Sequence, residues 1–281
     1  MQADVAELIA AALEHASPAL VPAASRDALR AVVPRPAEAL AVGLECRLGA
    51  RDDHKVDLGL CLRPEGTPAE VDAVFLEFDQ EAGRFERAPL AFWRFGAGVP
   101  CAEARALIAA FGAGADALGA FDALVASLPT STRVTDIGSL SARPGGTLRV
   151  GLLVAADALA RDLPRGCAAL VSELAADHEQ LRVQYDLVAP ARWVGIELHH
   201  AHTPHEAGTW AQAWERLVAR GVCTPAQRDA LARWPGRHAA RLPRLGWCAI
   251  ARTISHLKLT VDPAGEVCAK VYVFVEAVPP L

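Results

Sequence analysis

Residues that can bind anions, accept protons or stabilise cations recur on short alternating stretches of the sequence. In chain order these residues are Glu45, Arg47, Arg149, Arg182, Tyr185, Glu197, Arg252, His256, Lys258, Lys270 and Tyr272. Successive side chains of a β-strand point to opposite faces, so residues two positions apart share a face. We therefore expect most of these stretches to present polar groups on one face and apolar side chains on the other.

These side-chain types suit chemistry in which an anion departs and a cation forms. Arginine and lysine can hold the anion, aromatic rings can stabilise a carbocation, and a carboxylate can accept a proton. Glu45 and Glu197 close the similar stretches Val42-Gly43-Leu44-Glu45 and Val194-Gly195-Ile196-Glu197. Both are candidate proton acceptors. For any single residue of the set, a structural ion pair inside the fold is the alternative.

Ten stretches with an alternating pattern predict the strands that must position these side chains. Turn signals such as Arg143-Pro144-Gly145-Gly146 join them into five hairpins. The predicted strands are 41–48, 56–62, 74–78, 90–95, 133–140, 148–154, 181–188, 193–200, 248–261 and 267–275.

Helical spacing of apolar residues predicts pairs of helices before most of the hairpins. Threonine-proline pairs at Thr67, Thr203 and Thr224 are typical helix starts, the first of only a very short helix or turn. The predicted helices are 5–15, 26–32, 103–111, 117–128, 156–163, 167–177, 206–220 and 226–234.

This order of helix pairs and hairpins predicts an α+β fold in which a ten-stranded antiparallel barrel is surrounded by helices. Helices would cover the apolar face of the sheet, and closure would turn the polar face into a lumen. The alternative is an open sheet whose polar face meets water. No linker composition divides the chain, so we expect one domain over residues 1–281.

Composition limits the binding partners and the cellular compartment that we expect for the protein. The chain has 281 residues, 52% of them hydrophobic and 22% charged, with a net charge of -5. This balance makes nucleic acid an unexpected partner. Its seven cysteines are scattered without a CxxC pair, as in proteins with reduced thiols. With no signal peptide and no membrane-spanning apolar run in the sequence, we expect a cytoplasmic protein that does not bind membranes. Composition favours no oligomeric state.

The layout resembles the ABBA, or PT-barrel, prenyltransferases, which include tryptophan-type and cyanobactin peptide enzymes. The resemblance covers most of the chain as topology. Locally it rests on Leu44-Glu45 facing Val56-Asp57-Leu58, and on the pairs His256-x-Lys258 and Lys270-x-Tyr272. It implies transfer of an allylic prenyl group from its diphosphate to an aromatic small molecule or a peptide, in natural-product biosynthesis. The closing segment also resembles uncharacterised proteins near peptide natural-product (RiPP) gene clusters.

The resemblance implies a role for each candidate residue. Glu45 would accept the proton of the acceptor, and Glu197 is its counterpart in the similar stretch. Tyr185 and Tyr272 would shield the allyl cation. Diphosphate would be held by Arg47, Arg149, Arg182, Arg252, His256, Lys258 and Lys270. No DDxxD-like magnesium motif occurs, so the lumen cations would do the electrostatic work, and no cofactor is expected.

Two departures keep a second hypothesis open. Asp57 stands where the resemblance predicts a cation, and the chain has only two tyrosines. A catalytically inactive barrel that binds a peptide or a small anionic ligand would explain both.

A third hypothesis is a metal enzyme. The run His199-His200-Ala201-His202, followed by His205, gathers four imidazoles. Zinc sites need three or four ligands fixed around one point. Alternation on a strand would separate His199 from His200, and His205 would open a helix. We therefore expect a solvated or capping role for this run and no metal site.

Overall fold

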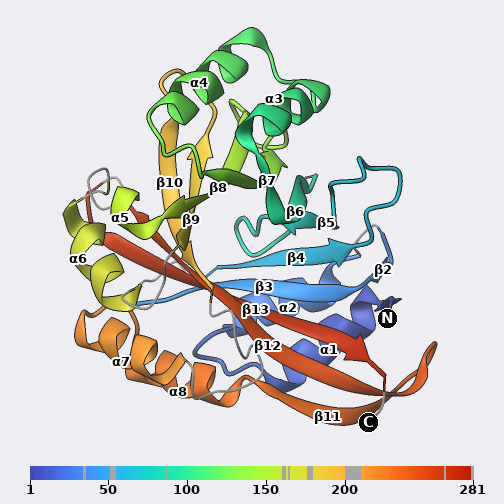
Figure 1. The fold of residues 1–281 in the computed structure, drawn as a ribbon. Helices are drawn as coiled ribbons and strands as arrows, with labels where there is room; N and C mark the ends of the chain where they lie inside the picture. Colours follow the sequence, from blue (N-terminus) through green and yellow to red (C-terminus); the bar gives the residue numbers. More distant parts are fainter. Residues whose placement is uncertain are drawn as a thin grey trace.

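A closed ring of ten antiparallel strands forms the centre of the molecule (Figure 1). The computed structural model describes residues 1–33, 36–50, 55–85, 88–159, 163, 165–175, 180–199, 210–262 and 264–279. The main sheet follows the order β10-β9-β8-β7-β6-β5-β4-β3-β13-β12-β11, and β10 also pairs with β12. That extra pairing closes the ring and leaves β11 outside it.

The ring strands match the ten predicted strands one for one. They are β3 (Ala41–Arg47), β4 (Val56–Leu62), β5 (Ala73–Phe78), β6 (Leu90–Pro100), β7 (Arg133–Ser139), β8 (Leu148–Ala155), β9 (Gln180–Asp186), β10 (Arg192–Leu198), β12 (Gly246–Val261) and β13 (Val267–Val278). The predicted α+β barrel is thus confirmed. The short pair β1 (Ala3–Asp4) and β2 (Glu38–Ala39) and the strand β11 (Gly236–Leu242) were not predicted. The β11 sequence has no clear apolar alternation and becomes a strand by pairing with the first part of β12.

The helices lie around the periphery of the ring (Figure 1). They are α1 (Val5–His15), α2 (Ala23–Ala31), α3 (Cys101–Ala110), α4 (Ala115–Ala126), α5 (Ala156–Leu159), α6 (Arg165–Leu174), α7 (Ala211–Ala219) and α8 (Pro225–Arg233). The predicted bounds of α1 are those observed. Thr224 caps α8 as predicted, whereas the Thr67 segment forms a turn. The predicted start at Thr203 lies outside the described residues. Within the described ranges, no helix is long and apolar enough to cross a membrane.

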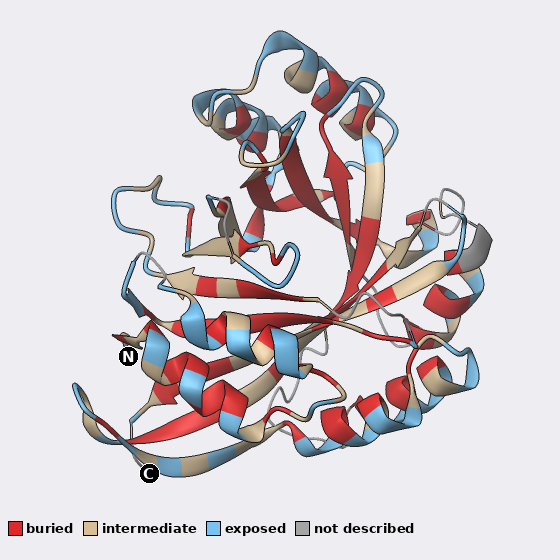
Figure 2. Cartoon of the chain, turned by 180° about the vertical axis from the view of Figure 1, so that it is seen from behind, coloured by how far each residue is buried: buried red, intermediate tan, exposed pale blue. Residues whose placement is uncertain are grey.

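The outward face of the barrel is apolar and is covered by helices. On β13 the residues Ala269, Val271, Val273 and Val275 are at most 1% exposed. They belong to one hydrophobic core with the buried side of α1, which packs against β13 and β3. Figure 2 shows the helices buried on one side and exposed on the other. Burial of this face is the main stabilising contribution that holds the helices on the barrel. The intervening residues of each strand face the lumen, so the open-sheet alternative is excluded.

Candidate active site in the barrel lumen

The lumen contains a cavity of about 110 Å³ to which the ring strands contribute side chains. Seven of the predicted site residues line it. They are Glu45, Arg149, Arg182, Glu197, His256, Lys258 and Tyr272. The cavity also takes in apolar rings and further charged groups, so one lumen combines ionic and hydrophobic binding surfaces. This volume is smaller than that of most small-molecule sites.

A row of charged side chains crosses five neighbouring strands. Strand pairing sets Arg182 opposite Glu197, Glu197 opposite Lys258, Lys258 opposite Lys270, and Lys270 opposite Arg47. Directly opposed residues share a face of an antiparallel sheet. Lys270 and Arg47 therefore face inward too, although they lie beyond the cavity lining. Four cations and one carboxylate form this row.

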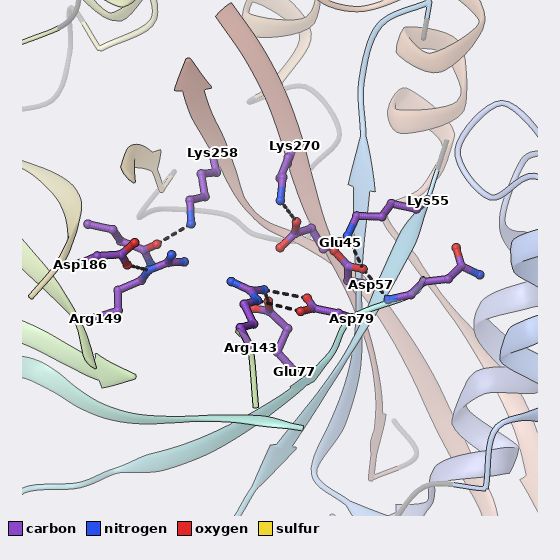
Figure 3. Close-up of polar contacts among 12 residues, drawn as sticks. Glu45, Lys55, Asp57, Glu77, Asp79, Arg143, Arg149, Asp186, Lys258 and Lys270 are labelled. Carbon is purple, nitrogen blue, oxygen red and sulfur yellow. Dashed lines mark hydrogen bonds and ion pairs between the residues drawn. The ribbon is translucent and has the colours of Figure 1, made fainter. Parts of the chain in front are cut away.

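Glu45 lies beside this row and is 5% exposed. Lys270 Nζ donates a hydrogen bond to Glu45 Oε1 (Figure 3). Burial alone would raise the pKa of Glu45, but the nearby Lys270 and Lys258 charges and bonds from Lys270 and Tyr272 lower it to about 2. Glu45 is therefore ionised and paired. The pair satisfies a carboxylate that would otherwise be costly to bury.

Asp57 lies directly opposite Glu45 on β4. It is 3% exposed, accepts a hydrogen bond from the Gln80 backbone N–H at 2.8 Å and lies 3.5 Å from Lys55 Nζ. Burial and the charge of Glu45 raise the pKa of Asp57 to about 6. Two carboxylates thus lie side by side with pKa values shifted in opposite directions. The pKa of Glu45 is lowered and that of Asp57 is raised because the cation nearer to the pair lies against Glu45.

Arg143 reaches this carboxylate group from the turn between β7 and β8. Its guanidinium donates to Asp79 through two bonds of 2.7 Å and to Glu77 at 3.0 Å (Figure 3). Burial and the charge of Glu45 raise the pKa of Glu77 to about 7. The sequence predicted Arg143 only as part of a turn. A turn residue lies on no strand face, so the direction of its side chain could not be predicted from alternation.

Glu197 has a different set of neighbours on the other side of the lumen. Gln184 Nε2 donates to Glu197 Oε1 at 2.6 Å, and Arg182 lies 3.5 Å from Oε2. Lys258 Nζ donates to the Gln184 side-chain oxygen. Although burial opposes it, neighbouring His256, His199 and Arg182 hold the pKa of Glu197 well below its usual range. Arg149 pairs with Asp186 at 2.7 Å, close to the residues around Glu197.

Aromatic rings form a third part of the lumen. Phe75, Phe92, Tyr272 and Phe274 line the cavity, and the Phe75 and Phe274 rings meet edge to face with centroids 6.2 Å apart. Tyr272 stacks on His256 with centroids 4.0 Å apart. Gly43 makes room for this layer, since a Cβ there would lie 2.8 Å from the Phe274 ring. The phenylalanines of this layer were not among the residues singled out from the sequence, whereas Tyr272 was.

Arg252 faces away from the lumen, so its predicted orientation was wrong. A bulge interrupts the β12–β13 pairing between Ile254 and His256. Strict alternation predicted Arg252 and His256 on one face, but the extra residue inverts the faces before the bulge. Arg252 consequently pairs with the outward-facing Val275 and lies near Gly236 of β11.

Tyr185 is also outside the lumen. It is 8% exposed and belongs to the hydrophobic core on the helix side of β9, whereas its neighbour Gln184 lines the cavity. Alternation on β9 places Tyr185 with Leu181 and Val183, away from Arg182. Its predicted role beside an allyl cation does not fit this orientation.

Arg94 and Asp136 are lumen residues that sequence analysis did not single out. Arg94 shares the inward face of β6 with Phe92, so alternation contained the signal for it. Asp136 follows a register shift in the β7–β8 pairing, which alternation does not reveal. Burial raises the pKa of Asp136, an effect that Arg182 and Arg94 partly oppose.

Of the histidine run, His199 lies within the described residues, and His200, His202 and His205 lie outside them. His199 extends the inward face of β10, where its ring stacks on His256 with centroids 4.6 Å apart.

The closed ten-stranded antiparallel ring, its outer helices and its polar lumen define a PT-barrel architecture, as the sequence resemblance predicted. Among solved structures of ABBA prenyltransferases, AnaPT from Neosartorya fischeri has a TM-score of 0.45 at 12% identity, over 83% of this chain and 77% of AnaPT. NotF in complex with brevianamide F and DMSPP has a TM-score of 0.41 at 13% identity, over 89% of this chain and 83% of NotF. No family model and no curated protein matches the sequence.

Proposed function

We propose that this chain transfers an allylic prenyl group from its diphosphate to an aromatic or peptide acceptor inside the barrel, with protein cations in place of a metal ion at the diphosphate. The observation that carries the proposal is the order of side chains in the lumen. A row of cations lies beside Glu45 and Tyr272, and the phenylalanine rings follow. This order matches a substrate with an anionic head, a reacting carbon and an apolar tail.

Lys258, Lys270 and Arg182 would hold the diphosphate, with Arg47 and Arg149 at the margins of the row. In the reaction the bond between the allyl carbon and the diphosphate oxygen breaks, and its electron pair leaves with the diphosphate. The cations stabilise that developing negative charge in a site with little water. The allyl group is left as a carbocation.

Tyr272, stacked on His256, would shield the carbocation by cation–π attraction, with Phe274 and Phe75 around the prenyl tail. Shielding keeps water from capturing the cation before the acceptor attacks. The acceptor then supplies the electron pair of the new bond to the allyl carbon and becomes positively charged until it loses a proton.

Glu45 is the proposed acceptor of that proton. Its contact with Lys270 makes it a weak base in the empty barrel, because its pKa is about 2. A bound diphosphate would compete with Glu45 for the Lys270 ammonium. Loss of this partner would raise the pKa of Glu45 and strengthen it as a base. Asp57, directly opposite, could receive the proton next. Glu197 remains the second candidate base.

A second function, a barrel that binds a peptide or a small anion without catalysis, is favoured by the charge balance of the cavity. The lining contains five carboxylates, Glu45, Asp57, Glu77, Asp136 and Glu197, against four Arg or Lys side chains, Arg94, Arg149, Arg182 and Lys258. A diphosphate would have to compete with Glu197 for Arg182 and with Asp186 for Arg149.

Calorimetric titration with dimethylallyl and geranyl thiodiphosphate, without and then with magnesium, separates the two functions. Lys258→Met is the main variant, because Lys258 donates its hydrogen bond to the Gln184 side-chain amide and not to a carboxylate. We expect saturable binding by the natural chain and at least tenfold weaker binding by Lys258→Met.

The matched control is Arg252→Met, which removes a β12 cation from the outer face. It should bind the analogue as the natural chain does. If neither analogue binds to the folded natural chain, prenyl transfer is refuted and the non-catalytic barrel remains.

A further inference from the structure

Two histidines and one glutamate meet where the barrel closes. Glu197, His199 and His256 each offer one ligand atom, and these atoms lie within 4.8 Å of one another. His199 Nε2 is 3.2 Å from Glu197 Oε2, and His256 Nε2 is 3.8 Å from Glu197 Oε1. We propose that these three residues form a binding site for a divalent transition-metal ion that prefers imidazole, such as Zn²⁺.

The strands hold the three donors from one side. Glu197 lies on β10 and His199 directly follows this strand, two residues further on, so their side chains share its inward face. His256 lies on β12, the strand whose pairing with β10 closes the ring. Its ring stacks on that of His199 with centroids 4.6 Å apart. Donors on two adjacent strands need no loop rearrangement to meet one ion.

The distances suit a small ion. With zinc-to-donor bonds of about 2.0–2.1 Å and tetrahedral angles, neighbouring donor atoms lie about 3.3 Å apart. The 3.2 Å contact between His199 and Glu197 already has this spacing. All three donor atoms lie within 4.8 Å of one another, so they must approach by at most about 1.5 Å to reach this spacing.

A hydroxyl contact also favours metal binding by His256. Ser255 Oγ lies 3.0 Å from His256 Nδ1 and can orient the ring so that Nε2 faces Glu197.

The remaining coordination positions point to a ligand in the lumen. Glu197 and His256 line the cavity. Two imidazoles and one carboxylate on one side of an ion leave its other side open, as in catalytic and oxygen-binding metal sites. Imidazole donors select zinc, cobalt, nickel or iron over magnesium and calcium, which prefer oxygen ligands.

Gln184 Nε2, which donates to Glu197 Oε1 at 2.6 Å, and Arg182, 3.5 Å from Oε2, compete with the ion for the carboxylate. Lys258 and Arg94 add further positive charge on this side of the lumen, and Asp136 adds negative charge. The site must therefore bind its ion through the two imidazoles as much as through charge. This proposal is independent of prenyl transfer, and its test does not measure activity.

The experiment is calorimetric titration of chelator-treated full-length chain with Zn²⁺, followed by Co²⁺ titration monitored by visible absorption. We expect one ion per chain and a cobalt spectrum without the intense charge-transfer band of cysteine ligation. His256→Ala and His199→Ala should each weaken binding at least tenfold. Glu197→Gln should also weaken it, and it keeps the hydrogen-bonding shape of the side chain.

The control is His238→Ala. His238 and His15 form another histidine pair, with tilted rings and centroids 4.5 Å apart, between β11 and α1. This variant should bind zinc as the natural chain does. His256→Gln replaces His256→Ala if near-ultraviolet circular dichroism shows that the alanine variant is unfolded. The proposal is overturned if the natural chain binds no zinc, or if binding survives loss of His256, which would place the ion on other histidines or cysteines.

Discussion

Strands β3 and β10 contain nearly the same four-residue sequence, but its glutamate has different neighbours in each strand. Glu45 and Glu197 each follow a valine, a glycine and a branched apolar residue, and both are 5% exposed in the lumen. Glu45 contacts one lysine and faces Asp57. Glu197 has Gln184, Arg182 and His199 around it. The local sequence thus sets the direction of each glutamate, and the neighbouring strands set its chemistry.

The glycines of the two stretches differ in the same way. A Cβ on Gly43 would meet the end of the Phe274 ring at 2.8 Å. A Cβ on Gly195 would meet the backbone oxygen of Leu259 at 2.6 Å. The first glycine makes room for a side chain of the cavity, and the second lets β10 approach β12 where the ring closes.

The largest expected difference concerns the partners of the two glutamates. Lys270→Met keeps the aliphatic stem but leaves Glu45 buried beside Asp57 without its cation, so it should destabilise the fold by about 3–5 kcal/mol at pH 7. Arg182→Met should cost about 2 kcal/mol, because Glu197 retains hydrogen bonds from Gln184 and His199. Urea unfolding measures both. Equal losses of unfolding free energy in the two variants would show that Lys270 and Arg182 stabilise their glutamates to the same extent.

The next effect in size comes from the two glycines. Gly195→Ala should cost about 3 kcal/mol, since a backbone oxygen in a sheet cannot move away without weakening the ladder. Gly43→Ala should cost below about 1 kcal/mol, because the Phe274 ring can rotate toward the cavity. The same unfolding assay tests both variants. A Gly43→Ala cost as large as that of Gly195→Ala would mean that the Phe274 ring is as fixed as the backbone.

The third effect in size is a pH dependence that Asp57 adds on the Glu45 side. Native Asp57 has a pKa of about 6, against about 3.9 when unfolded. Between about pH 4 and 6, Asp57 is protonated in the folded chain and ionised in the unfolded chain. Unfolding therefore releases a proton, and the free energy of unfolding falls as pH rises through this range. Asp57→Asn should therefore become more stable than the natural chain by roughly 1–3 kcal/mol at pH 7, and the difference should shrink below pH 4.

Thermal unfolding from pH 3.5 to 8 measures this difference. Asp27→Asn, at an exposed helical position, controls for the loss of one negative charge. A Glu45→Gln variant should show the opposite sign. The low pKa of Glu45 stabilises the fold above about pH 4.5 and that stabilisation is lost as pH falls toward 2. An Asp57→Asn advantage that is constant across pH would contradict the raised pKa of Asp57.

Much of the architecture could be predicted from the sequence, because its signals are local. A period of two residues defines a strand and its two faces whatever lies beside it, and all ten ring strands followed from that pattern. The bounds of α1 followed from helical spacing in the same way. The inward direction of Glu45, Arg182, Glu197, Lys258 and Lys270 is also a property of each strand alone.

Only the tertiary structure decided which lumen residues meet. The β12 bulge that turns Arg252 outward depends on how β12 pairs with β13, and Arg143 reaches Glu77 and Asp79 from a turn with no periodicity. His199 and His256 meet because β10 pairs with β12 to close the ring. Alternation determines the face of a side chain, whereas register and closure determine its neighbours, and those neighbours set the charge, the pKa and the ligand of the site.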